Sequence, residues 1–170
     1  MQKRTLLKLG LASSALLGLA GGAAGLLFRP GLQNGGGLSL AGREVCTAVG
    51  QAVLNSSLPA HGLLRQSALQ ALMGRIDALV SALPPHTQAE LSQLLAVLAS
   101  APGRQALAGL DQAWPMAPID AVQQALQAMR LSGFALRSQA YGALHDIVTG
   151  AYFADAGTWP MLGYPGPQKI

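Results

Sequence analysis

Charged residues are scarce in this chain of 170 residues: Lys, Arg, Asp and Glu together make up 11%, against roughly 25% in an average soluble domain. Four of the eleven basic residues lie within the first thirty positions, namely Lys3, Arg4, Lys8 and Arg29. The remaining seven basic residues are balanced by seven acidic ones, so the body of the chain is formally neutral. Nucleic-acid binding requires a basic face, and the sequence therefore predicts no nucleic-acid partner.

Cysteine is nearly absent, with Cys46 as the single example. One thiol cannot form an internal disulfide and cannot hold a metal alone. We expect Cys46 to act as a small apolar residue inside a helix. The alternative, in an oxidising compartment, is a disulfide between two chains.

Sequence motifs typical of catalytic, metal-binding and cofactor-binding sites are also lacking. No Glu-x-x-His pair, Cys-x-x-Cys-His haem motif, Gly-x-Ser-x-Gly elbow or dinucleotide fingerprint after a strand occurs. The sequence therefore predicts no catalytic residue, no metal ligand and no cofactor site in this chain. Polar residues suited to an acid–base or anion site occur together only at Arg130, Arg137, Tyr141 and His145. The last three share a helix face, which we interpret as a polar stripe that bonds a neighbouring helix.

Residues 1–29 have the layout of an export signal, since a basic start precedes an uncharged apolar run over 9–28. The start resembles a twin-arginine signal, whose motif reads Ser/Thr-Arg-Arg-x-Phe-Leu-Lys. Lys3, Arg4, Leu6, Leu7 and Lys8 occupy its named positions, with Lys3 in place of the first arginine and Leu6 in place of phenylalanine. An ordinary secretory signal is the alternative interpretation.

The expected cellular location of the protein follows from residues 1–29, which we call the leader. Small side chains favour cleavage after Gly22 or Ala24. An uncut run of about 20 residues would be just long enough to span a bilayer. In both cases the basic flank stays in the cytoplasm, which predicts a periplasmic body, membrane-associated if the leader is retained.

Beyond the leader, composition and periodicity indicate an all-α protein. Alanine, leucine and glutamine favour helix, and no segment alternates as a strand would. Five glycines make 30–42 a predicted linker. Apolar spacing predicts a helical domain over 43–153, a four- to five-helix bundle. Its expected helices are 43–55, 61–83, one from a Thr87–Glu90 capping box to about 101, one from 118 or 119 to Gly133, and 134–153, with a short helical turn at 103–110.

The segment 154–170 completes the sequence as an irregular tail rich in aromatic residues and proline, which we expect to dock on a partner. Together with the motifs around Pro118–Asp120, 125–132 and 143–153, it resembles small subunits of the gluconate 2-dehydrogenase subunit 3 type. The most specific part of this resemblance is the ending that contains Trp159, Gly163, Tyr164, Pro165, Gly166 and Pro167.

The resemblance implies a function without catalysis by this chain. In such complexes a flavoprotein of the glucose-methanol-choline type binds FAD and oxidises a sugar or an alcohol, and a cytochrome c often accepts the electrons. The small subunit supplies the signal that is recognised by the twin-arginine translocase. Two alternatives are a stand-alone periplasmic helical protein that binds a small ligand, and a membrane-tethered interaction protein.

Overall fold

The computed structural model describes residues 29–164, except the side chains of Met161 and Leu162, and its regular structure in this range is helical. The elements are α3 (Leu40–Val53), α4 (Gly62–Ser81), α5 (Pro85–Ala99), α6 (Ala101–Ala108), η2 (Trp114–Met116), α7 (Ile119–Arg130), α8 (Ala135–Phe153) and η3 (Ala156–Leu162), where η marks a 3-10 helix. The predicted all-α bundle is confirmed. The short turn expected at 103–110 is a complete helix, α6, that begins earlier.

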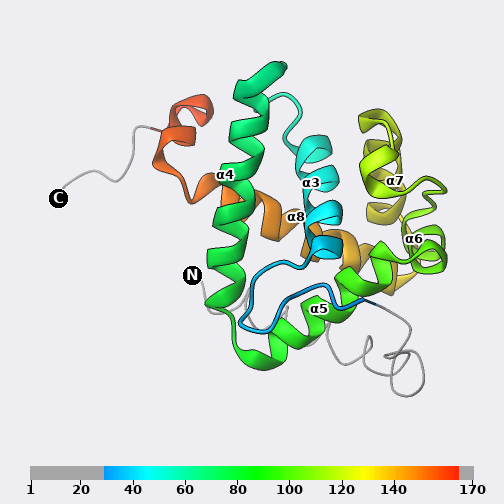
Figure 1. Cartoon of the computed structure of the whole chain (residues 1–170). Coiled ribbons are helices and arrows are strands. Elements are labelled where there is room, and N and C mark those ends of the chain that lie inside the picture. The colour runs from blue at the N-terminus through cyan, green and yellow to red at the C-terminus, as the bar shows by residue number, and fades with distance from the viewer. Residues whose placement is uncertain (1–28, 165–170) are drawn as a thin grey trace.

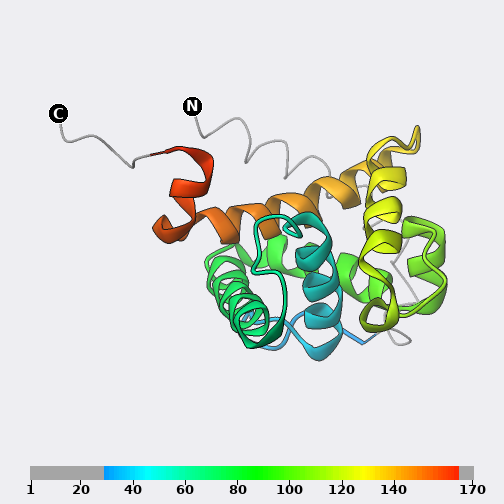
Figure 2. The same cartoon turned by 90° about the horizontal axis from the view of Figure 1, so that it is seen from above.

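Two helices organise the bundle. Helix α3 lies at its centre and contacts α4, α5, α7, α8 and η2 (Figure 1). Its buried residues are mostly small, with alanine, glycine, cysteine and valine among them, and small side chains let five neighbours approach one helix closely. Helix α8 runs along one side of the bundle, where it contacts α3, α4, α6 and α7 (Figure 2).

Several helix ends differ from the prediction. The Thr87–Glu90 capping box is wrong, because α5 already begins at Pro85 with Pro84 as its N-cap. Proline suits the first helical position, since its missing N–H would have no partner there and its φ is already helical. Helix α3 begins at Leu40, three residues earlier than expected, because the Ser39 hydroxyl accepts a hydrogen bond from the Gly42 N–H at 3.1 Å.

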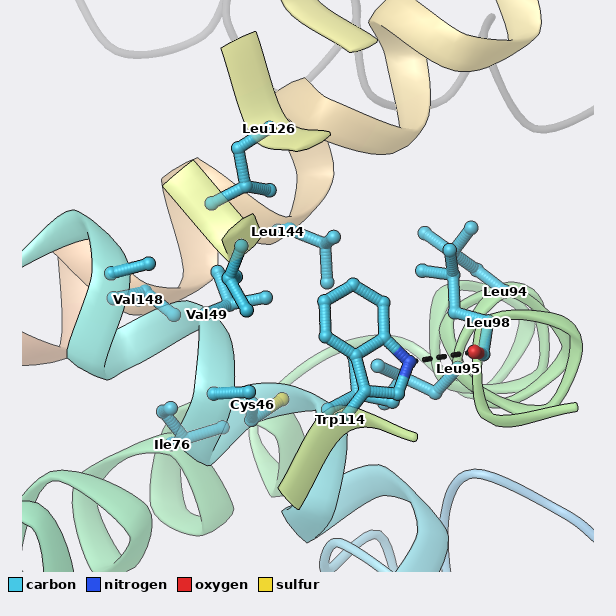
Figure 3. Close-up of a cluster of buried hydrophobic side chains, with 14 of the residues drawn as sticks. Cys46, Val49, Ile76, Leu94, Leu95, Leu98, Trp114, Leu126, Leu144 and Val148 are labelled. Carbon is cyan, nitrogen blue, oxygen red and sulfur yellow. Dashed lines mark hydrogen bonds between the residues drawn. The ribbon is translucent and has the colours of Figure 1, made fainter. Parts of the chain in front are cut away.

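The core gathers around Trp114, whose side chain is 2% exposed. Its indole lies among Leu94, Leu95 and Leu98 of α5, with Leu144 of α8 on another side (Figure 3). The indole N–H donates to the Leu98 carbonyl at 2.7 Å. The expectation that Trp114 packs within the domain is thus confirmed.

Arg104 shapes the loop that leads to Trp114. It is 8% exposed, and its guanidinium donates to the carbonyl groups of Leu110 and Asp111, both at 3.1 Å. Helix α6 ends at Ala108, immediately before this loop, and its C-cap Gly109 has a left-handed φ of 66° that suits glycine. The buried Arg104 guanidinium therefore supplies hydrogen-bond donors to two loop carbonyls that have no partner in regular secondary structure.

We predict that Arg104→Met lowers the free energy of unfolding by about 1–3 kcal/mol, because the buried Leu110 carbonyl loses a charged donor. Urea denaturation followed by circular dichroism would measure the change. Arg130→Met is the matched control, since that arginine is exposed and bonds Gln127 within its own helix, so its loss should change stability by less than about 0.5 kcal/mol. Equal effects in the two variants would contradict a stabilising role for Arg104.

Candidate functional site

The structure covers only part of the residues predicted to act in export and docking. Lys3, Arg4, Leu6, Leu7 and Lys8 lie outside the described residues. The same holds for Pro165, Gly166 and Pro167. Trp159, Gly163 and Tyr164 are described, and they lie together at the end of α8.

The first part of the tail is ordered on the domain, which corrects the expectation of an irregular segment from 154. Asp155 is the N-cap of η3, and its carboxylate accepts a hydrogen bond from the Gly157 N–H at 2.9 Å. The buried Thr158 hydroxyl lies 2.7 Å from the Asp155 carbonyl oxygen, to which it donates. The indole N–H of Trp159 donates to the Phe153 carbonyl at 2.8 Å. The tail therefore folds back and caps the C-terminal end of α8.

An arginine of α4 ties this capped segment to the rest of the bundle. The guanidinium of Arg75 donates to the Ala151 carbonyl at 3.0 Å and pairs with the Asp155 carboxylate at 3.1 Å. After η3, Gly163 takes a left-handed φ of 68° and turns the chain so that the rings of Trp159 and Tyr164 lie 5.5 Å apart. Tyr164 is 48% exposed. The aromatic pair is consequently held in place and still accessible.

The aromatic pair leaves an accessible apolar surface at the end of α8. We call Trp159 and Tyr164 the aromatic docking surface. Accessible tyrosine and tryptophan side chains are typical of protein–protein contact sites. Leu63 and Leu64, in the first turn of α4, are also exposed, at 80% and 74%.

The polar face of α8 does not form a site. The Arg137 guanidinium donates to the Leu107 carbonyl of α6 at 2.7 Å, which confirms the interpretation as a stripe that bonds a neighbouring helix. The rings of Tyr141 and His145 stack with centroids 5.5 Å apart, and His145 approaches the Asp146 carboxylate at 3.4 Å. Arg130 bonds Gln127 on its own helix. These side chains do not converge on a common cavity.

A pocket of about 310 Å³ occurs elsewhere, between α3, η2 and the start of α7. Its apolar lining comes from Trp114, Pro115, Ala117, Ile119, Val122 and Ala48, and its polar lining from Arg43, Glu44, Thr47 and Gln51. Arg43 also pairs with Asp77 of α4. Sequence reasoning missed this pocket, because its residues come from three segments that no local pattern connects.

Cys46 lies in the core and is 1% exposed. Burial raises the pKa of its thiol to about 12, the Asp77 carboxylate contributes in the same direction, and Arg43 opposes them. Since the thiolate is the reactive form, the folded protein is expected to be inert at this position. The expectation of a small apolar residue inside a helix is confirmed.

We therefore predict that Cys46 in the folded protein resists a chromogenic disulfide reagent at pH 8. Unfolding exposes the thiol and returns its pKa to about 8.5, so the same reagent should then react completely within minutes. The absorbance of the released thiolate, followed with and without denaturant, measures both rates. Similar rates in the two conditions would contradict the burial of Cys46.

Metal-binding clusters of three or more His, Cys, Asp or Glu do not occur within residues 29–164. No helix of that same range is long and apolar enough to cross a membrane. Comparisons with family models, curated proteins and solved structures found no match for this chain.

Proposed function

We propose that this chain is the non-catalytic small subunit that exports and supports a FAD-dependent dehydrogenase of the glucose-methanol-choline type acting on a sugar or an alcohol. In this proposal residues 1–29 direct the complex to the periplasm through the twin-arginine translocase. FAD belongs to the partner subunit, and a cytochrome c is the expected electron acceptor.

The aromatic docking surface is the observation that carries this proposal. Tyrosine and tryptophan dominate the energetics of many protein interfaces, because each buries a large area and fixes few rotatable bonds. Here η3 holds Trp159 against the Phe153 carbonyl before any partner binds. A surface organised in advance loses less conformational entropy on association.

The proposed route also agrees with the folding requirements of such a partner. The twin-arginine translocase carries folded proteins, and a flavoprotein has to bind FAD in the cytoplasm before it is exported. A subunit that binds only the folded flavoprotein stabilises that state by mass action. One small protein without catalytic residues can thus direct the flavoprotein to the periplasm and also stabilise its folded state.

The test is an affinity purification of the tagged chain from the periplasmic fraction of its native host, with an absorption spectrum and mass spectrometry of the product. We expect a yellow complex that contains a stoichiometric flavoprotein. Tyr164→Ala should reduce the recovered flavin about ten-fold, since an interface tyrosine of this kind contributes roughly 1–2 kcal/mol.

Phe134→Ala combined with Leu131→Ser is the matched control. Both side chains are exposed, at 75% and 70%, and they lie at the other end of α8, whose 19 residues span roughly 28 Å. This control should recover the flavoprotein normally. Equal losses in Tyr164→Ala and in this control would show that the aromatic docking surface is not the contact site, and a colourless product from the unmodified chain would reject the proposed function.

The pocket favours a second candidate, a stand-alone periplasmic protein that binds a small ligand. Its volume lies at the lower end of the range for small-molecule sites, and its apolar base with a few polar groups is typical of them. Thr47→Trp would fill the pocket. A small molecule that co-purifies with the unmodified chain but not with Thr47→Trp would favour this candidate over the subunit.

A further inference from the structure

Residues 31–39, which we call the clasp, join the leader to the first helix and are bonded to two other helices. The N–H groups of Gly31 and Leu32 donate to the backbone carbonyl and the hydroxyl of Ser92 in α5, at 3.2 and 3.1 Å. At the other end, the Leu38 N–H donates to the Asp77 carboxylate of α4 at 2.8 Å. The segment predicted as a linker is therefore attached to the domain at both of its ends.

The clasp is also closed on itself, and its two leucines are buried. The Ser39 N–H donates to the Gly31 carbonyl at 3.0 Å, and an isolated bridge joins Leu32 to Leu38. Both leucines belong to the core, with 7% and 1% exposure. Asp77 reinforces this arrangement, because its carboxylate also pairs with Arg43 at the start of α3.

Two glycines show how tightly the clasp packs. A Cβ atom on Gly31 would lie 2.3 Å from the Leu95 Cβ, and one on Gly42 would lie 2.1 Å from the Gly31 carbonyl oxygen. Neither space admits a larger residue without a shift of the backbone. Glycine is thus required at 31 by the close approach to α5, and at 42 by the close approach to the Gly31 carbonyl.

Proteases bind their substrates as extended chains, with several residues on each side of the bond to be cut. Presenting the bonds beside Leu32 or Leu38 would require that part of the clasp to leave α5 or α4 and to expose a buried leucine. Such local opening is rare where backbone hydrogen bonds and buried apolar contacts coincide. Arg29 and Pro30, by contrast, are exposed.

We infer that the clasp sets the limit of proteolytic processing: the leader is removed before Gly31, and residues 31–39 remain in the mature protein as part of its fold. The inference rests on the proposed function for the existence of a leader that is removed. It assigns to the Gly-rich segment a structural task, which is to give the processed chain a protected N-terminal end.

The first test is N-terminal sequencing and intact mass of the protein recovered from the periplasm of its native host. We expect the leader to be absent and the mature N-terminus to lie at or before Gly31. A mature N-terminus at Leu32 or later would overturn the inference while leaving export intact. Protein that stays in the cytoplasm would instead reject the proposed function, so the two failures are distinguishable.

The second test is limited proteolysis of the purified full chain with thermolysin, which cuts before leucine. The bonds before Leu32 and Leu38 should resist in the unmodified protein. Asp77→Ala removes the acceptor of the Leu38 N–H and should speed cleavage at these bonds roughly ten-fold or more. Ser92→Ala is a milder variant that frees only the Leu32 N–H and should have a smaller effect of the same sign.

Asp146→Ala, at an exposed acid of α8, is the matched control and should leave the clasp bonds protected. Circular dichroism of each variant checks that its helices are retained. Rapid cleavage before Leu32 or Leu38 in the unmodified chain would overturn the inference, and so would equal rates in Asp77→Ala and Asp146→Ala.

Discussion

Replacing Trp114 with alanine is expected to lower the free energy of unfolding by about 3–5 kcal/mol, the usual cost of removing a fully buried aromatic side chain. The indole fills the space between η2, α5 and α8, and few neighbours can move into the cavity because α3 already occupies its other side (Figure 3). Since a domain of this size is stable by about 5–15 kcal/mol in total, the variant should lose a large part of its stability. Urea denaturation followed by circular dichroism measures this without relying on tryptophan fluorescence.

Trp114→Phe separates packing from hydrogen bonding. Phenylalanine retains most of the apolar contacts, while the Leu98 carbonyl loses the indole donor at 2.7 Å. We expect this variant to lose about 1–3 kcal/mol, clearly less than the alanine variant. If both substitutions changed stability by under about 1 kcal/mol, the typical value for an arbitrary site, Trp114 would not be central to the core.

Periodicity predicted the buried face of α4 well, because that face depends on the helix alone. The spacing selected seven apolar positions between 69 and 83, and the four that are buried, Leu72, Met73, Ile76 and Val80, are all among them. The other three, Leu69, Leu79 and Leu83, pack partly against the core. The 3.6-residue period is a local property of the chain, so one sequence suffices to detect it.

The clasp could not be predicted in the same way. Five glycines indicate flexibility when only neighbouring residues are considered. The order of this segment depends on Asp77 and Ser92, which are 39 and 60 residues away from their partners in the chain. Glycine is required here because the backbone approaches its neighbours closely, and not because the segment needs conformational freedom. Only the packed structure distinguishes these two roles of glycine.

The structure of the tail could be predicted from the sequence only in part. Its proline and glycine content correctly excluded a continued α-helix, yet Asp155 followed by Gly157 is a local signal for a capped turn. That signal predicts where η3 begins. The bond from Trp159 back to the Phe153 carbonyl depends on the end of α8 and has no counterpart in the pattern.

Export gives the largest effect that we predict, because transport through one route is close to all-or-none. Replacing Lys3 and Arg4 together with glutamine should leave the protein in the cytoplasm, as measured by immunoblots of cytoplasmic and periplasmic fractions. The control removes two positive charges from the body, at Arg65 and Arg130, and should be exported normally. Full export of the Lys3/Arg4 variant would reject residues 1–29 as the export signal.

A single substitution that conserves charge then identifies the route. Arg4→Lys keeps the basic start that any secretory signal needs, but it replaces a planar guanidinium with five N–H donors by an ammonium with three. Arg4 occupies the second arginine of the twin-arginine motif that the leader resembles, so under the proposed function we expect export of Arg4→Lys to fall at least ten-fold, and export of Lys3→Arg to be retained. Undiminished export of Arg4→Lys would assign the chain to the ordinary secretory route. A partner that must fold around FAD in the cytoplasm could not follow it there, so that result would also count against the flavoprotein complex.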